Sequence, residues 1–273
     1  MSAEAVRPAL AGSESGPRSA LGDITRRFAR DRPALIALWM LGALALAALT
    51  APWIAQHVLH RSPDELQLMQ RVRVGGREVD VVSNVGIPIG PSGAAPLGVD
   101  LIGRDVLTRL LFGARVSLFT SLLGTLLALL AGLAAGLLAG YYGGVVDSVL
   151  SRFVDAMMAI PVLLLAIALA SVLRQGSVWM VVLVLALVNW TYLARIVRAE
   201  VLSLKQREFI EAARALGARD RGILTHHLLP NLVGPVIVFA TLSVAGNILL
   251  ESALSFLGVG IQPPMPSWGN MIQ

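Results

Sequence analysis

Residues 116–138, VSLFTSLLGTLLALLAGLAAGLL, contain no charged side chain. A helix needs roughly 20 apolar residues to cross the hydrocarbon core of a bilayer, about 30 Å thick, and it satisfies its backbone hydrogen bonds internally. The stretch therefore predicts a membrane-spanning helix. Small residues recur along it at Gly124, Gly132, Ala135 and Gly136, and such a pattern favours close packing against another helix.

Four further apolar stretches are long enough to cross a bilayer, namely 33–55, 153–173, 178–196 and 232–254. The composition agrees, because the chain is 56% hydrophobic and only 14% charged, whereas soluble domains carry about 25% charged residues. We therefore expect an all-α, polytopic membrane helical bundle in which five spans are visible.

The polar tail 1–32 precedes the first span and holds six arginines against four acidic residues. Arg26, Arg27, Arg30 and Arg32 lie beside the span, which is too long for the apolar core of a signal peptide. An uncleaved anchor with its N-terminus in the cytoplasm is therefore expected. Alternate crossing then places the loop 56–115 outside the cell and the loop 197–231 inside. Residues 116–273, which follow the outer loop and include the inner one, are expected to form the core of the bundle.

Several kinds of chemistry are disfavoured by the composition. The chain has no cysteine and one lysine, Lys205, which does not follow a glycine-rich phosphate loop. The net charge of +5 is spread between apolar segments, so we expect no nucleic acid as a partner. His57 and His60 have helical metal-ligand spacing but lack a third ligand nearby, so no metal site is expected. We expect no cofactor in this chain.

The outer loop contains a strictly alternating stretch, RVRVGGREVDVV, at residues 71–82. Alternation on both sides of Gly75-Gly76 predicts a β-hairpin with a two-residue turn. The hairpin could face a protein that delivers a solute, or it could be a solvated decoration of the loop.

The inner loop contains the stretch EAARALGARDRGILTHHLLPN at residues 211–231. Apolar or small residues at Phe209, Ala212, Ala213 and Leu216 recur on one face of a predicted helix. Gly217 is a typical helix stop. Asp220 can cap a second short helix, with apolar residues at Ile223, Leu224, Leu228 and Leu229, which Pro230 would end.

Three interpretations of this two-helix unit remain. It could be an amphipathic connector at the membrane surface, a DNA-binding helix-turn-helix, or a docking unit for a cytoplasmic protein. Short connections tie the unit to membrane spans on both sides, which disfavours DNA. A face of small residues favours docking, because it lets another helix approach closely.

The unit resembles the EAA loop of the membrane subunits of bacterial ABC importers. That loop has EAA, three residues, Gly, nine residues, a position that is usually isoleucine, one residue, then Leu-Pro. The matching residues here are Glu211, Ala212, Ala213, Gly217, Leu229 and Pro230. His227 stands at the position that is usually isoleucine. Dipeptide permeases resemble this chain there, because they also have histidine in the pattern HxLPN.

Three other stretches are similar to the dipeptide, oligopeptide and nickel permeases, in particular to their C-type subunit. They are PLGVDLIGRDVLTRLLFGARVSL (96–118), GYYGGVVDSVLSRFVDAMMAIPVLLLAI (140–167) and ESALSFLGVGIQPPMPSWGNMI (251–272). The resemblance implies the type I ABC importer permease fold. That family places a sixth span after the last of these stretches, and the sequence shows none.

The resemblance also implies a function and a set of partners. The chain would be half of a two-subunit pore in the bacterial inner membrane, importing di- or oligopeptides, and would not itself be an enzyme. A sister permease, cytoplasmic ATPase subunits that bind ATP and Mg²⁺, an extracytoplasmic peptide-binding protein and lipid would be its partners. Glu211 would anchor the ATPase, Ala212 and Ala213 would allow close approach, and Gly217 would set the bend.

Polar residues within spans are the candidates for the transport pathway. Glu251 and Asn247 are the leading candidates. Asn247 and Asn189 also suit hydrogen bonding between helices, and the Glu251 carboxylate could instead extend to the outer membrane surface. Asp155 is expected to pair with Arg152, one turn before it. In the outer segment, Gly103, Arg104 and Asp105 favour a structural clasp over contact with a solute.

Two other functions stay open. A membrane scaffold could recruit a cytoplasmic partner without moving a solute, and the absent sixth span favours it. A nickel or glutathione importer would use a closely similar subunit. A self-contained secondary transporter is disfavoured, because the spans have almost none of the mid-membrane charge that such proteins need.

Overall fold

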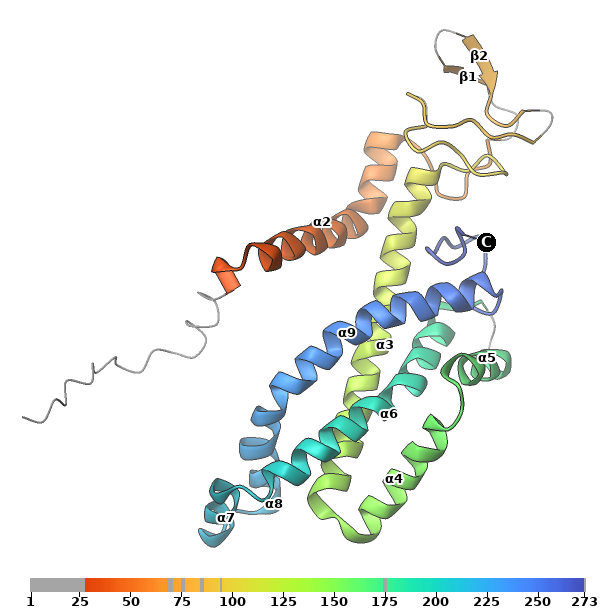
Figure 1. Cartoon of the computed structure of the whole chain (residues 1–273). Helices are drawn as coiled ribbons and strands as arrows, with labels where there is room; N and C mark the ends of the chain where they lie inside the picture. Colours follow the sequence, from red (N-terminus) through yellow and green to blue (C-terminus); the bar gives the residue numbers. More distant parts are fainter. Residues whose placement is uncertain are drawn as a thin grey trace, which may run out of the picture. The chain divides into compact units, whose positions relative to one another are not determined.

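A computed structural model describes residues 28–67, 71–74, 77–83, 86–93, 95–173 and 176–272 of the chain. The chain divides into two units, Met1–Leu44 and Ala45–Gln273. In the first, the described residues are 28–44, which include the start of the helix α2 (Arg32–Ile54), and none of them is buried. In the second, α2 continues into a wider π-type turn, η1 (Ala55–Leu59), and all the remaining elements follow (Figure 1).

Four helices of the described chain are long and apolar enough to cross a membrane: Arg32–Leu59, Val106–Tyr142, Val178–Leu204 and Asp220–Phe256. A fifth crossing is obtained if the helix pair Gly144–Met158 and Val162–Val172, bent by 93°, counts as one span. The all-α membrane bundle predicted from the sequence is therefore confirmed.

The bent pair differs from the expected single span 153–173. α4 (Gly144–Met158) begins inside the expected inner loop, and α5 (Val162–Val172) follows the break. Pro161 explains the break, because proline lacks a backbone N–H and disfavours the helical conformation of the residue before it, Ile160. The stretch 139–152, which lies between the predicted spans 116–138 and 153–173, is thus helical except around Gly143, which has a φ of +67°.

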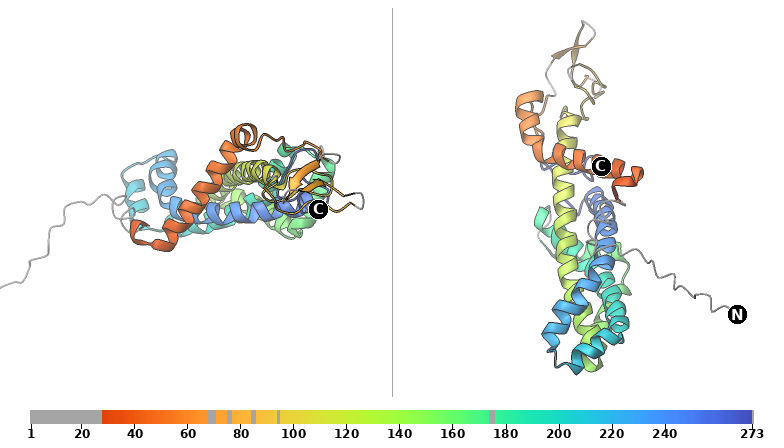
Figure 2. Two further views of the ribbon diagram at one scale, coloured as in Figure 1. Left: turned by 90° about the horizontal axis from the view of Figure 1, so that it is seen from above. Right: turned by 90° about the vertical axis from the view of Figure 1, so that its left-hand side faces the viewer.

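The bundle is built on the contact between α3 (Val106–Tyr142) and α6 (Val178–Leu204), which run along each other for most of their length (Figure 2). A Cβ atom added at Gly132 would lie 2.6 Å from the Trp190 carbonyl oxygen, and one at Gly136 would lie 2.6 Å from that of Ala194. The predicted close packing at these glycines is confirmed, because only a missing side chain allows such an approach.

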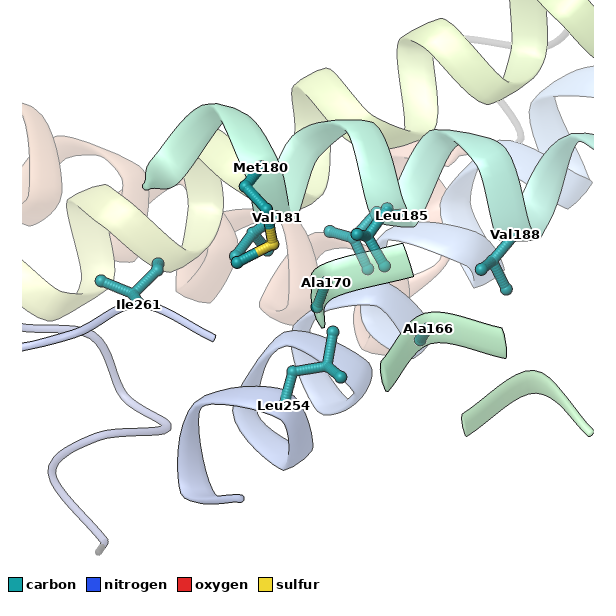
Figure 3. Close-up of a cluster of buried hydrophobic side chains, with 9 residues drawn as sticks. Ala166, Ala170, Met180, Val181, Leu185, Val188, Leu254 and Ile261 are labelled. Carbon is teal, nitrogen blue, oxygen red and sulfur yellow. The ribbon is translucent and has the colours of Figure 1, made fainter. Parts of the chain in front are cut away.

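Two hydrophobic clusters hold the helices together. One joins α5, α6 and α9 (Leu229–Phe256) around Ala166, Leu185 and Leu254, and also takes in Ile261 from the segment after α9 (Figure 3). The other joins the far ends of α3, α6 and α9 around Tyr141, Val201 and Leu232. The clusters therefore lie towards opposite ends of the bundle.

The predicted hairpin is present. β1 (Arg71–Val74) and β2 (Arg77–Asp80) are antiparallel, with Arg71 opposite Asp80 and Val74 opposite Arg77. This register leaves the two residues 75–76 to connect the strands; their own structure lies outside the described residues. β2 ends at Asp80, and the next residue, Val81, is buried with Ala95 and Val99 in a small core of the same loop.

The inner-loop unit consists of α7 (Glu208–Ala215), α8 (Asp220–Gly222) and the π-type turn η2 (Ile223–Leu228). The expectation that Pro230 ends the second helix is wrong, since one continuous helix runs from Asp220 to Phe256. Pro230 is tolerated there because it follows the wide turn η2, where Leu229 donates to the carbonyl of Leu224 five residues back. The Asn231 side-chain amide donates to the carbonyl oxygen of His227 at 2.6 Å.

Candidate functional site

The unit Glu208–Leu228, called the loop unit below, shows two contrasting faces. Ile210 is fully buried and Ala213 nearly so, and both point into the chain's own core. Phe209, Ala212 and Leu216 point outwards, and 89% of Leu216 is exposed. Together these three side chains leave an apolar surface open on the outside of the loop unit.

The predicted face of Phe209, Ala212, Ala213 and Leu216 is therefore divided between the two sides of α7. Ala213 is an internal packing residue and is not available for close approach by another protein. The open stripe has i, i+3 and i+7 spacing, from Phe209 through Ala212 to Leu216, which puts these three side chains on one line along the helix. Glu211 is exposed beside this stripe.

Polar contacts clamp the loop unit to the end of α3. The Tyr141 hydroxyl donates to Asp220 Oδ1 at 2.7 Å, and the Arg214 guanidinium lies 5.6 Å from the centre of the Tyr141 ring. Lys205 Nζ donates to the Gly140 carbonyl oxygen at 2.9 Å, which satisfies a free carbonyl at the helix end. The expectation that Asp220 caps the second short helix, α8, is wrong: Arg219 stands at the N-cap position without a side-chain cap, and the carboxylate of Asp220 accepts from Tyr141 instead.

Apolar packing reinforces this clamp. Ile210, Ile223 and Leu228 of the loop unit are buried in the same cluster as Val201 of α6 and Leu232 of α9. The ring of His227 lies 6.3 Å from that of Phe209, so the residue at the usual isoleucine position links the two halves of the unit. The loop unit therefore moves with the ends of three long helices.

Gly217 ends α7 in a left-handed conformation, with a φ of +82°. The N–H of Ala218 donates to the carbonyl of Ala213 at 3.0 Å, and that of Gly217 to the carbonyl of Arg214 at 2.9 Å. A Cβ atom at Gly217 would meet nothing within 4 Å. The requirement for glycine is therefore conformational, about 1–2 kcal/mol, and not steric.

Glu251 lies deep in the bundle and does not reach a surface. Its side chain is 0% exposed; Oε2 accepts from Ser117 Oγ at 2.9 Å and Oε1 from Ser255 Oγ at 2.8 Å. Each hydroxyl also accepts a backbone N–H, from Trp268 at 3.2 Å and Ile261 at 3.0 Å. The carboxylate therefore joins α3 and α9 to the segment after α9.

Asn247 makes the hydrogen bonds between helices that the sequence indicated. It accepts from Asn189 Nδ2 of α6 at 2.8 Å and donates to Thr125 Oγ1 of α3 at 2.8 Å. Only 1% of Asn247 is exposed. Its polar side chain is thus committed to neighbours on two other helices.

At the other end of α3, Asp105 caps the helix. Its Oδ1 accepts the Thr108 backbone N–H and hydroxyl, both at 2.8 Å, and its Oδ2 accepts from Arg61 at 2.8 Å. Gly103 has a φ of +78° in the turn before it. Arg104 donates to Asp100 at 2.7 Å. These residues tie the outer loop to the start of α3.

The expected pair of Asp155 with Arg152 is wrong. Asp155 instead binds Arg195 of α6 at 2.5 Å, because α4 lies against α6 and the pairing is made across the bundle. A second ion pair, between Asp147 and Arg198, was not predicted from the sequence. The only indication in the sequence was that Asp147 and Asp155 are eight positions apart on one face of a helix. Asp155, Arg195 and Arg198 line a cavity of about 290 Å³.

Comparison with known proteins identifies the chain. Residues 132–273 match the family described as binding-protein-dependent transport system inner membrane component, and residues 19–69 match the N-terminal TM domain of oligopeptide transport permease C. The chain belongs to this permease family. It is a C-type subunit of the peptide and oligopeptide branch of ABC importers, as the sequence motifs predicted.

Curated relatives agree. The chain is 36% identical over 247 residues to a putative peptide permease of Brucella ovis, covering 90% of this chain and 74% of the relative. It is 45% identical over 183 residues to a dipeptide transport system permease of Alkalihalophilus pseudofirmus, covering 67% and 60%. A glutathione transport system permease of Salmonella typhimurium is 40% identical over 247 residues, covering 90% and 75%.

Among solved structures, the MetNI methionine ABC transporter in an inward-facing conformation is similar. The TM-score is 0.50 at 21% identity, and the match covers 56% of this chain and 76% of that one. This likeness shows the permease fold. Permease subunits of this family are multi-pass membrane proteins that are not themselves enzymes; ATP hydrolysis takes place in a separate subunit.

Proposed function

We propose that this permease forms half of the pore of an importer for di- or oligopeptides and is driven by an ATPase that grips the loop unit. The names of the relatives, which specify peptides, dipeptides and glutathione, support the class of solute. The open stripe of Phe209, Ala212 and Leu216 carries the coupling role, because it offers an apolar contact at the tip of a rigidly held unit.

The topology follows from charge. The arginines of the tail 1–32 place the N-terminus in the cytoplasm, and the loop unit then faces the cytoplasm, where the ATP- and Mg²⁺-binding subunits would be. The hairpin and the loop around Gly103 would face outwards, towards a peptide-binding protein. The sister permease would supply the other half of the pore.

The residues that match the EAA pattern, in the loop unit and at the start of α9, differ in their roles. Glu211, exposed beside the open stripe, would be the polar anchor for the ATPase, and Ala212 would allow close approach. Ala213, Leu229 and Pro230 instead belong to the internal packing and to the join with α9. Gly217 sets the angle between α7 and α8 through its positive φ.

The spans contribute hydrogen-bonded junctions. Glu251 and Asn247, the sequence candidates for the pathway, have their polar atoms bonded to side chains of neighbouring helices. We propose that they hold the helices in register during the conformational cycle and do not contact the peptide.

The coupling role is tested by Leu216→Asp in the complete transporter. A charge at this exposed tip should leave the chain folded in the membrane and remove most of the ATPase that co-purifies with it. Gln206→Asp, which adds the same charge to the exposed turn before α7 and away from the stripe, is the matched control. Unchanged co-purification and peptide uptake in Leu216→Asp would show that the stripe is not the docking surface.

A further inference from the structure

A cavity of about 410 Å³ lies at the end of the bundle opposite the loop unit. It forms where the loop 88–104, the first turn of α3 and residues 270–271 meet. Val99, Ile102, Val106 and Met271 give it an apolar wall, and its polar lining includes two arginines. A cavity with one apolar wall and a few convergent polar groups is typical of a site for a small ligand.

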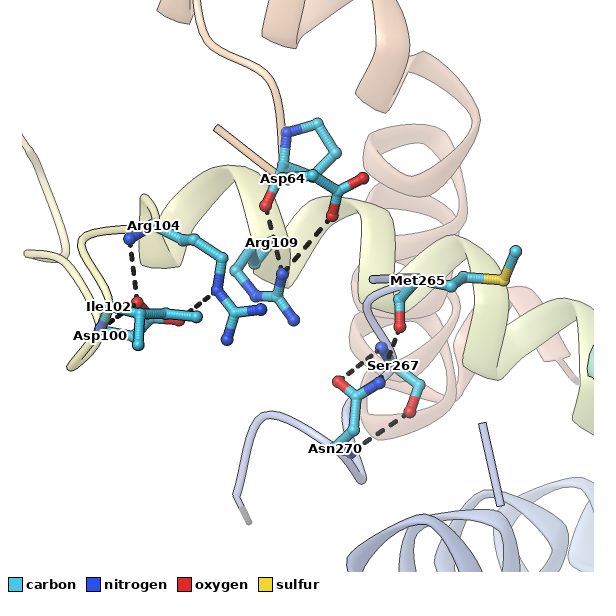
Figure 4. A network of polar contacts seen from close by, with 9 residues as sticks. Asp64, Asp100, Ile102, Arg104, Arg109, Met265, Ser267 and Asn270 are labelled. Carbon is cyan, nitrogen blue, oxygen red and sulfur yellow. Dashed lines mark hydrogen bonds and ion pairs between the residues drawn. The ribbon is translucent and has the colours of Figure 1, made fainter. Parts of the chain in front are cut away.

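Arg109 is the most buried charged residue of this lining, with 2% of the residue exposed. Its Nη1 donates to the Pro63 carbonyl oxygen at 3.2 Å and lies 3.7 Å from Asp64 Oδ1 (Figure 4). Within the described chain, its Nε and Nη2 groups make no hydrogen bond, although Arg109 borders the cavity. Neither nitrogen is a buried atom without a partner, so both can be reached from the cavity, where an anion could accept from them.

Arg104 borders the same cavity and adds a second guanidinium. Its Nε is bound to Asp100 Oδ2 at 2.7 Å. The other oxygen of Asp100 accepts the backbone N–H groups of Ile102 and Arg104, at 3.1 and 2.9 Å. Asp100 is therefore saturated. The lining of two arginines and one aspartate carries one net positive charge, which Asp64 beside Arg109 balances.

We propose that this cavity binds the C-terminal carboxylate of the incoming peptide, held by Arg109 and Arg104, with the neighbouring side chain of the peptide against Ile102 and Val106. The identity of the solute rests on the function proposed above. A guanidinium presents parallel N–H donors that match the two oxygens of a carboxylate. The cavity lies on the side of the bundle from which a peptide would arrive.

The test uses the complete transporter in lipid nanodiscs without nucleotide, and measures weak binding by saturation-transfer NMR. The probes are the dipeptide Ala-Phe, its C-terminal amide, and 3-phenylpropionate, which has the carboxylate without a peptide. Unmodified protein should bind Ala-Phe and phenylpropionate at least about tenfold more tightly than the amide, as loss of a charge-assisted pair predicts.

Arg109→Gln and Arg104→Gln should each remove this preference for the free acid. Arg71→Gln is the control, because Arg71 lies on the hairpin in an exposed pair with Asp80, and should bind as the unmodified protein does. Arg104→Gln keeps the test decisive if Arg109→Gln does not fold, since Arg104 is less buried.

Equal binding of acid and amide, or unchanged binding in both glutamine variants, would overturn the proposal. A third outcome would also overturn it: native mass spectrometry shows that Arg109→Gln loses a bound phosphatidylglycerol, while the binding of Ala-Phe is unchanged. The site would then hold a lipid phosphate. The transporter could also bind phenylpropionate through these arginines and yet take up no peptide. That result would support the carboxylate site but refute the proposal that the solute is a peptide.

Discussion

Single polar residues inside the spans join helices that are far apart in the sequence. Glu251 shows this most clearly, because two serine hydroxyls donate to it and each is itself held by a backbone N–H. Ser117 lies on α3 and Ser255 on α9, so the two carboxylate oxygens bond to hydroxyls of both helices. One ionisable side chain thus organises the contact between α3, α9 and the segment after α9.

Two serines on α3 provide a matched test of this junction. Ser117 and Ser121 are one turn apart and both fully buried, but Ser121 Oγ has no hydrogen-bond partner within the described chain. Ser117→Ala should lower the free energy of unfolding by about 1–3 kcal/mol, because it leaves buried groups unpaired. Ser121→Ala should be neutral or slightly stabilising. Thermal unfolding of the purified protein in detergent measures both, and equal effects would contradict the assignment.

Glycine at 217 is a second residue whose role is conformational. Gly217→Val forces a β-branched residue to a φ of +82°, whereas Gly222 has a φ of −64° and accepts valine without strain. Neither position has an atom within 4 Å of an added Cβ. Gly217→Val should cost at least about 1–2 kcal/mol locally and let ATP hydrolysis continue with little uptake.

The measurement is the number of peptides imported per ATP hydrolysed in proteoliposomes. Gly222→Val should keep the ratio of the unmodified protein. Uptake at the unmodified rate in Gly217→Val would show that the bend of the loop unit does not transmit the motion of the ATPase.

At the scale of the element, α3 is the scaffold to which the other parts attach. One of its ends is capped by Asp105, the other is clamped to the loop unit through Tyr141, and its middle lies against α6. A helix of 37 residues is about 55 Å long, so it connects both surfaces of the membrane. A change at the loop unit can therefore be transmitted to the outer end as movement of one rigid rod.

The glycines on the α6-facing side of α3 are essential to that arrangement. A Cβ atom at Gly136 would lie 2.6 Å from the Ala194 carbonyl oxygen and from Val197 Cβ. Gly136→Val should therefore separate α3 from α6 and destabilise the bundle by more than the roughly 1–3 kcal/mol usual for overpacking. Ala131→Val, on an exposed face of the same helix, should have little effect. Detergent thermal unfolding of the two variants compares them directly, and similar melting temperatures would be unexpected.

At the scale of the whole molecule, the two ends of the bundle have different chemistry. The loop-unit end offers an apolar stripe on a rigid unit, and the hairpin end offers a cavity lined with arginine. This difference between the two ends suits a permease that receives a solute on one side of the membrane and binds its ATPase on the other. The orientation in the membrane can be measured directly, because the chain has no cysteine.

Single cysteines at the two ends should react with a membrane-impermeant maleimide in opposite ways. Arg71→Cys, on an exposed position of the hairpin, should be labelled in intact cells. Arg219→Cys, exposed in the loop unit and away from the open stripe, should be labelled only after the cells are permeabilised. The reverse pattern would place the loop unit outside the cytoplasm, and the proposed coupling to an ATPase would then be impossible.

The sequence alone determined the membrane helices, the hairpin and the permease family, because each depends on a short run of residues. Apolar length decides whether a segment crosses lipid, alternation around Gly75-Gly76 decides the hairpin, and the spacing from Glu211 to Pro230 decides the family. Only the tertiary structure decided which side chains meet. Ser117 and Glu251 are 134 positions apart and Tyr141 and Asp220 are 79 apart, and their contacts depend on which helices are neighbours. For the same reason the inward side of Ala213, the partner of Asp155 and the cavity beside Arg109 could not be derived from local pattern.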